Sequence, residues 1–201
     1  MAAGAPHLLA AGTRALVLTV SDGVAAGGRV DESGAALAGR LEALGASVDR
    51  AVSADDQVQI AERVRAAAAS YGLIVTTGGT GLTPRDLTPQ AIRTILDYEI
   101  PGLGEAMRAA GRASTALADL SRSLGGVRGR ALVVCVPGSP RGATESLAAI
   151  ESLLAHALET LAGPHDHGRP AGPAGPAPGS SAAGPSAAPP VAQDREQEDA
   201  D

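Results

Sequence analysis

A glycine-rich stretch between an apolar run and a charged pair holds the residues best suited to chemistry. Residues 73–75 are apolar, and three of the four residues 78–81 are glycine. Because glycine has no Cβ, such a loop can turn sharply and bring its main-chain N–H groups close to a ligand. A strand, a glycine loop and a helix start are typical of an anion site at the carboxyl edge of a parallel sheet.

The charged pair after the glycines, Arg85 and Asp86, has two interpretations. Asp86 could hold a magnesium ion, directly or through water, while Arg85 neutralises phosphate oxygens. Alternatively, the two form a loop ion pair, or Asp86 caps the helix predicted at residues 90–96. Thr88 followed by Pro89 is the better cap and first helical residue. This leaves Asp86 without a structural task and favours a functional one.

Two further polar residues have equally plain structural interpretations. Asp55 is well placed to cap the helix that contains Ile60 and Val64, and from the residues alone capping is the favoured role. Ser139 either hydrogen-bonds an anionic ligand or caps the last helix.

The elements that position these residues alternate between strand and helix. Apolar runs predict strands at residues 15–20, 48–52, 73–76 and 131–136. Helical spacing predicts helices from residue 31, from residue 55, over 90–96, from 101 and over 142–161, with a hairpin or irregular excursion over 117–130. This alternation predicts an α/β fold with a mostly parallel sheet. Its carboxyl edge would bring together three polar loops, namely residues 21–23, 78–86 and 137–139.

Composition sets the domain limits. From residue 164 the chain is rich in Pro, Ala, Gly and Ser and ends in an acidic run, so we expect residues 164–201 to be a disordered tail. We expect residues 1–13 to be flexible and residues 14–163 to form one domain. Of the formal net charge of −6, the tail contributes −4 through six acids and two arginines. The nearly neutral domain that remains is a poor candidate for nucleic-acid binding.

Residue usage excludes several kinds of site. The chain has no lysine, which excludes a P-loop lysine, a Schiff-base lysine and a lysine general base. Cys135, the single cysteine, lies in an apolar run and is interpreted as a core residue. Neither a signal peptide nor a membrane span is indicated, so we expect a cytoplasmic protein.

The motifs occur in an order that resembles a known family. They are Ser21-Asp22-Gly23, Asp55-Asp56, Thr76-Thr77-Gly78-Gly79-Thr80-Gly81 with Arg85-Asp86 and Thr88-Pro89, Pro101-Gly102 with Glu105-Ala106-Met107-Arg108, Leu120-Ser121-Arg122, and Pro137-Gly138-Ser139-Pro140. The chain resembles the MogA/MoaB family of molybdenum cofactor biosynthesis, which includes the gephyrin G domain, over about residues 14–163. The resemblance implies a three-layer sandwich of the MogA-like, molybdopterin-binding kind.

The resemblance also implies an activity. Such an enzyme would be a molybdopterin adenylyltransferase, converting MgATP and molybdopterin to adenylyl-molybdopterin and pyrophosphate. The product would go to a MoeA-type molybdenum insertase, and the assembly would be a homotrimer, or a hexamer as in some MoaB-like members.

The family pattern assigns roles to residues. Asp55 and Asp86 fall on the catalytic, magnesium-associated aspartates, which overturns the capping preference for Asp55. The residues that fall on the phosphate, pterin or nucleotide sites are Ser21, Asp22, Thr77, Gly78, Gly79, Thr80, Gly81, Arg85, Ser121, Arg122, Pro137, Gly138 and Ser139.

Two alternatives remain open. One is a MoaB-like protein that binds molybdopterin as a scaffold without turnover, against which the presence of both Asp55 and Asp86 argues. The other is a generic nucleotide-binding redox domain, which binding of a nicotinamide cofactor would reveal.

Overall fold

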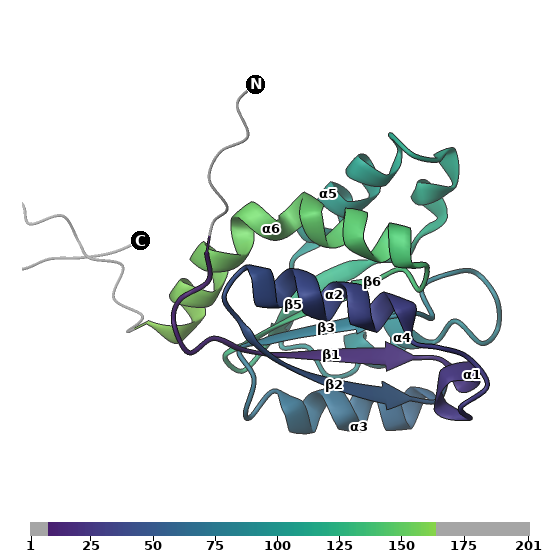
Figure 1. The fold of residues 1–201 in the computed structure, drawn as a ribbon, viewed down its shortest axis with the longest axis horizontal. Coiled ribbons are helices and arrows are strands. Elements are labelled where there is room, and N and C mark those ends of the chain that lie inside the picture. The colour runs from purple at the N-terminus through teal and green to yellow at the C-terminus, as the bar shows by residue number, and fades with distance from the viewer. Residues whose placement is uncertain (1–7, 164–201) are drawn as a thin grey trace, which may run out of the picture. The chain divides into compact units, whose positions relative to one another are not determined.

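The computed structural model describes residues 8–163, and the predicted disorder of the tail lies outside these residues. A twisted six-stranded sheet forms the centre (Figure 1). Its strands are β1 (Arg14–Val20), β2 (Ser47–Ser53), β3 (Leu73–Thr77), β4 (Tyr98–Glu99), β5 (Leu124–Arg128) and β6 (Ala131–Val136), in the order β2-β1-β3-β6-β5-β4. Strands β2, β1, β3 and β6 run parallel, and β5 is antiparallel to both of its neighbours.

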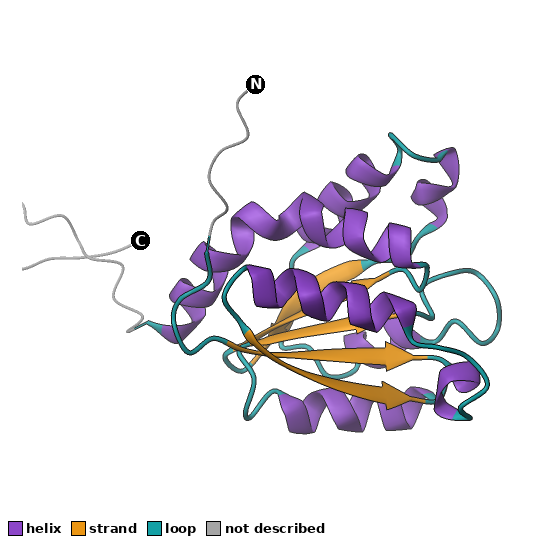
Figure 2. Cartoon of the chain, in the orientation of Figure 1, coloured by secondary structure: helices purple, strands orange, loops and turns teal. Residues whose placement is uncertain are grey.

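Helices cover both faces of the sheet, which makes three layers (Figure 2). One face carries α2 (Glu32–Ala43), α5 (Pro101–Gly111) and α6 (Pro140–Ala162), and the other carries α3 (Gln57–Ala67) and α4 (Thr88–Arg93). The short helix α1 (Asp22–Ala25) and the 3-10 helix η1 (Ala116–Leu120) lie in connections. The predicted three-layer α/β fold with a mostly parallel sheet is confirmed.

Side-chain alternation along the central strands produces two hydrophobic cores. Val17 and Val75 point toward α2 and α6, whereas Leu18 and Ile74 point toward α3 and α4. Strands β3 and β6 are fully buried along their length, as expected of parallel strands covered on both faces. Cys135 is buried in β6, and burial raises the pKa of its thiol to about 12, so it serves as a core residue.

The strand order places a crevice between β1 and β3. The chain moves from β1 to β2 on one side and then returns to β3 on the other side of β1. In open α/β sheets, ligands bind at such a reversal, beyond the carboxyl ends of the strands. Strand β1 ends immediately before Ser21, and strand β3 ends immediately before Gly78.

Three segments can be compared in detail with the sequence prediction. The segment 117–130, predicted as a hairpin or an irregular excursion, contains the end of η1 and a single strand, β5, which pairs with the following strand β6. Helix α4 begins at Thr88 and ends at Arg93, earlier at both ends than the predicted 90–96. Within the stretch 1–13, residues 8–13 are described, and Leu9 is buried in the core, where its N–H donates to Leu44 O at 2.8 Å.

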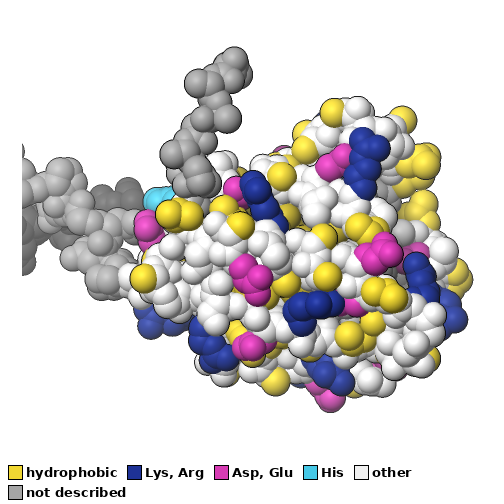
Figure 3. Space-filling model, in the orientation of Figure 1, with side chains coloured by type: hydrophobic (Ala, Val, Ile, Leu, Met, Phe, Trp, Pro, Cys, Tyr) yellow, Lys and Arg dark blue, Asp and Glu magenta, His cyan; other side chains and the backbone are white. Residues whose placement is uncertain are grey.

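The visible surface mixes charges of both signs (Figure 3). Exposed ion pairs join neighbouring elements, as where Arg40 on α2 binds both carboxylate oxygens of Glu151 on α6, at 2.8 and 2.9 Å. Within residues 8–163, no helix has the length and apolar character needed to cross a membrane.

Candidate functional site

The loops after β3 and β6 approach so closely that only glycine fits. Gly78 has a φ of +105°, and a Cβ built on it would lie 2.2 Å from Val20 O at the end of β1. Gly138 packs against Gly78, because a Cβ on Gly138 would lie 3.0 Å from the Gly78 Cα. Glycines at these two positions therefore allow the ends of β1, β3 and β6 to meet main chain to main chain.

Thr88 supports this loop rather than capping α4, so the predicted cap is wrong. Leu87 occupies the N-cap position without a side-chain hydrogen bond, and Thr88 is the first residue of the helix. The Thr88 Oγ1 is buried without a hydrogen-bond partner among the described residues. A Cβ on Gly79, whose φ is +63°, would lie 2.4 Å from that oxygen, so Thr88 fills the space that this glycine leaves open.

Asp55 is fixed by a reciprocal pair of hydrogen bonds with Asp22. The Asp22 N–H donates to Asp55 Oδ2 and the Asp55 N–H donates to Asp22 Oδ1, both at 2.9 Å. Capping of α3 falls to Asp56, whose Oδ1 accepts from Gln59 N–H at 2.8 Å, so the capping role considered for Asp55 is wrong. Asp55 Oδ1 accepts no hydrogen bond from residues 8–163 and remains available to a ligand.

Asp86 also has a structural task, contrary to the sequence interpretation. Its Oδ2 accepts from Thr83 N–H at 2.8 Å and from Thr83 Oγ1 at 2.6 Å, which closes the turn after the glycine loop. Both hydrogen bonds from Thr83 go to Oδ2, and Asp86 lines both cavities described below. The functional role predicted for Asp86 can therefore coexist with the structural one.

The environments of the two carboxylates shift their pKa values in opposite directions. Burial raises the pKa of Asp55, and the nearby negative charge of Asp86 raises it further. For Asp86, burial alone would raise the pKa, but the hydrogen bonds from Thr83 and Gly81 and the charge of Arg122 outweigh it and hold the pKa below its ordinary value. The two carboxylates are thus close enough to interact electrostatically, and Asp86 is the stronger acid.

Two arginines predicted to bind ligand are used to hold loops. Arg122 donates from Nε to Gly81 O at 2.8 Å and from Nη2 to Asp86 O, so it clamps the glycine loop from behind. Arg85 forms an ion pair with Asp22, rather than with Asp86 as the loop-pair interpretation supposed. Asp22, Arg85 and Arg122 therefore stabilise the site without lining its cavities.

Two cavities lie on either side of the glycine loop. We call them the α5 cavity, of about 520 Å³, and the α1 cavity, of about 660 Å³. Both are in the range of small-molecule sites. Of the predicted site residues, the α5 cavity is lined by Thr80, Gly81, Ser121 and Pro137, the α1 cavity by Ser21, Asp55, Thr77 and Gly78, and both cavities by Gly79, Asp86, Gly138 and Ser139.

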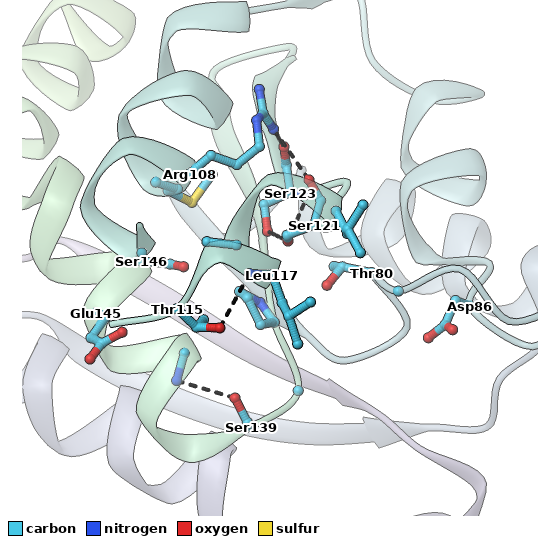
Figure 4. A pocket seen from close by; sticks show the side chains of 18 of the residues that line it. Thr80, Asp86, Arg108, Thr115, Leu117, Ser121, Ser123, Ser139, Glu145 and Ser146 are labelled. Carbon is cyan, nitrogen blue, oxygen red and sulfur yellow. Dashed lines mark hydrogen bonds between the residues drawn. The ribbon is translucent and has the colours of Figure 1, made fainter. Parts of the chain in front are cut away.

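The α5 cavity combines an apolar wall with hydroxyl groups (Figure 4). Met107, Leu117 and Leu120 form much of the wall, and Leu117 projects into the cavity from η1. Arg108 lies at its rim, but its guanidinium donates to the carbonyl of Ser123 at 2.9 Å. Such a mixture suits a flat, polar heterocycle better than a bare anion.

The boundary between the cavities offers main-chain donors. Ser139 caps α6, since its Oγ accepts from Gly142 N–H at 3.2 Å, which confirms the structural interpretation of this serine. The N–H groups of Gly79, Thr80 and Gly138 have no hydrogen-bond partner in the described part of the chain. Free N–H groups beside the start of a 23-residue helix can donate to a phosphate.

The donor set fits a magnesium ion shared with substrate phosphates. Magnesium commonly takes one or two carboxylates and completes its coordination with phosphate and water. Asp55 Oδ1 accepts no hydrogen bond from residues 8–163, and both Asp55 and Asp86 line the α1 cavity. Within residues 8–163, no cluster of three or more metal-ligating side chains occurs.

Sequence reasoning missed several residues of the site. One of them is Thr83, which donates to Asp86. The others line the α5 cavity and are Thr115, Ser123 and Glu145. Only Thr83 had a local signal, because in a Thr-x-x-Asp spacing the acidic side chain can reach back to the N–H of the threonine. Thr115 precedes η1, Ser123 precedes β5 and Glu145 lies on α6, and no local pattern indicates that they reach the cavity.

Comparison with known proteins decides the family. The model of the family described as "Probable molybdopterin binding domain" matches residues 16–156. The chain belongs to the MogA/MoaB family. It is 42% identical over 166 residues to the molybdenum cofactor biosynthesis bifunctional protein of Synechococcus elongatus. The matched region covers 82% of this chain and 52% of that protein.

Two further relatives extend the comparison. The molybdopterin adenylyltransferase of Escherichia coli is 42% identical over 82 residues, covering 41% of this chain and 42% of that enzyme. The solved structure of the molybdopterin biosynthesis Mog protein from Mycobacterium ulcerans is 38% identical, with a TM-score of 0.71 over 75% of this chain and 99% of that one. The chain spans about half the length of the curated relatives that it matches over most of its own sequence. These relatives support a role in molybdenum cofactor biosynthesis.

Proposed function

We propose that the protein is a molybdopterin adenylyltransferase. Two ligand-sized cavities meet at Gly79, Asp86, Gly138 and Ser139, and this shared boundary is the observation that carries the proposal. Adenylyl transfer joins two organic substrates through phosphate, so it needs two neighbouring pockets with an anion site between them. The relative named molybdopterin adenylyltransferase supports the same activity.

The arrangement suits an in-line displacement. An oxygen of the molybdopterin phosphate forms a new bond to the α-phosphorus of ATP, and the bond from that phosphorus to the bridging oxygen of the β-phosphate breaks. The electron pair leaves with pyrophosphate. The attacking and leaving oxygens must lie on opposite sides of phosphorus. Molybdopterin in the α5 cavity and ATP in the α1 cavity would meet this requirement at the shared boundary.

The chain's own residues supply positioning and charge neutralisation. The nucleophile is already an anion, so no strong base is needed, and the absence of lysine is no obstacle. The free N–H groups of Gly79, Thr80 and Gly138 would donate to the phosphate oxygens. Asp55 and Asp86 would orient the phosphates, and a magnesium ion held between them would supply charge neutralisation when bound.

Partners and assembly follow from the same proposal. Adenylyl-molybdopterin would pass to a MoeA-type insertase, and the active assembly would be a homotrimer or a hexamer, in the cytoplasm. Nucleic acid and membrane are not among the proposed partners.

The proposal is tested by mixing the protein with MgATP and molybdopterin and following pyrophosphate. We expect pyrophosphate release only when molybdopterin is present. If molybdopterin binds without pyrophosphate release, the protein is a molybdopterin-binding scaffold instead. Binding of a nicotinamide cofactor in place of both substrates would indicate a redox domain.

A further inference from the structure

One guanidinium in the α1 cavity has no partner within the described chain. Four acidic residues line the cavity, namely Asp31, Glu32, Asp55 and Asp86, and Arg29 is the single basic residue among its described lining. The negative charge of Asp31 is already balanced by Arg50, which donates to its carboxylate at 2.5 Å. The guanidinium of Arg29 forms no hydrogen bond or ion pair with residues 8–163.

The other arginines near the site are occupied by the protein itself. Arg85 is paired with Asp22, Arg122 donates to main-chain carbonyls, and Arg108 donates to Ser123 O. With no lysine in the chain, Arg29 is the side chain left to balance negative charge brought into the α1 cavity. Guanidinium groups bind phosphate oxygens through paired hydrogen bonds, which suits them to this task.

The fold holds the base of Arg29 in place. Its N–H donates to Gly23 O at 3.0 Å, which ties residue 29 back to helix α1. Its stem lies across Gly23, since a Cβ built on that glycine would be 2.8 Å from Arg29 Cδ and 3.2 Å from Cγ. Gly23 therefore leaves the space that the arginine stem occupies, and the side chain loses less freedom when it binds a ligand.

We propose that Arg29 binds the β- and γ-phosphates of ATP and neutralises pyrophosphate as it leaves. This inference rests on the proposed function, in which the α-phosphate lies at the boundary of the cavities and the leaving group points into the α1 cavity. Arg29 would then contact the part of ATP that AMP lacks. It is a residue for polyphosphate recognition rather than for adenosine recognition.

The test is calorimetric titration of the full chain with MgATP, magnesium pyrophosphate and AMP. Arg29→Ala should weaken the affinity for ATP and for pyrophosphate about 10-fold or more and leave AMP affinity unchanged. Arg29→Lys should recover part of the loss. Arg63→Ala is the matched control, because Arg63 is exposed on α3 and lines none of these cavities. Gly23→Ala, which displaces the stem, should reproduce the selective loss in a chain that still has the arginine.

The outcomes separate this inference from the proposed function. Unchanged pyrophosphate affinity in Arg29→Ala, an equal loss for AMP, or a wild-type chain that does not bind pyrophosphate would each overturn the role of Arg29. A wild-type chain that binds pyrophosphate through Arg29 but releases none from MgATP and molybdopterin would overturn the proposed reaction and leave the anion site standing.

Discussion

Asp22 and Asp55 hold each other, with the main-chain N–H of each donating to the carboxylate of the other at 2.9 Å. The pair joins the loop after β1 to the loop after β2, and it turns one Asp55 oxygen toward the main chain. The other oxygen of Asp22 pairs with Arg85 from the glycine-loop side. Asp22 is therefore a positioning residue for Asp55, and it links the two loops that carry the predicted catalytic carboxylates.

Substitutions of Asp22 separate these two contacts. Asp22→Asn keeps an acceptor for the Asp55 N–H but loses the ion pair, as does Arg85→Ala. Since that pair is largely exposed, we expect both variants to lose little stability and to retain most activity. Asp22→Ala also removes the hydrogen bond and should reduce kcat about 10-fold or more, because a misplaced Asp55 fails to orient phosphate. Steady-state kinetics of the three variants test this, and equal activity in all three would contradict it.

Ionisation of Asp55 should lower the stability of the folded protein. The folded-state pKa of Asp55 is raised by burial and by Asp86, so its ionisation destabilises the folded protein, starting above the ordinary carboxyl pKa and reaching its full size above the folded-state pKa. Asp55→Asn keeps an acceptor for the Asp22 N–H and removes the charge. The variant should melt at a higher temperature than wild type at neutral pH without magnesium. This difference in melting temperature should disappear as the pH falls below the ordinary carboxyl pKa. A variant that melts lower at neutral pH would show that the charge is stabilising.

Thr83 should set the pKa of Asp86. The Thr83 hydroxyl stabilises the ionised carboxylate, and Thr83→Val removes that donor while keeping the main-chain one. The pKa of Asp86 should then rise, moving the acidic limb of the kcat/KM profile to higher pH.

Thr83→Val should also lower the free energy of unfolding by about 1 kcal/mol at neutral pH. A lowered folded-state pKa contributes stability above the ordinary carboxyl value, and this is lost as the pH falls through the folded-state pKa. The difference between variant and wild type should therefore shrink in acid. An unshifted pH profile would mean that Asp86 does not titrate in the reaction.

Gly78 should tolerate no side chain. Gly78→Ala combines a positive φ with a contact of 2.2 Å to Val20 O, so it should lower the free energy of unfolding by about 3 kcal/mol or more. Gly129→Ala is the control, because Gly129 also has a positive φ but nothing lies within 4 Å of the added Cβ. Gly129→Ala should lower the free energy of unfolding by about 1–2 kcal/mol. Equal losses for the two variants in urea denaturation would show that the close approach of the strands is unimportant.

The sequence predicts most of the layering because its periodicities are local. The apolar runs of β1, β3 and β6 and the spacing of Leu147, Ile150 and Leu154 on α6 specify buried strands and an amphipathic helix. The glycine loop was also predictable, since Gly78 and Gly79 have positive φ values that few other residues adopt.

The errors concern choices between neighbouring polar residues. Asp55 and Asp56 are equally good caps by type, and only the contact with Asp22, 33 residues earlier in the chain, decides that Asp56 caps α3. Thr88 looked like a cap, but the space left by Gly79 draws it into the helix. The contacts of Arg122 with main-chain carbonyls 36 and 41 residues away were likewise not predicted. Long-range partners of this kind leave no local pattern.

The most direct test of the central claim follows labelled phosphate groups of ATP into the reaction products. The protein is incubated with molybdopterin and with ATP labelled at either the α- or the γ-phosphate, and the products are separated. If two substrates meet at the boundary of the two cavities, the α-label must appear in adenylyl-molybdopterin and the γ-label in pyrophosphate. Transfer of the γ-label to molybdopterin, or retention of both labels in ATP, would contradict the account.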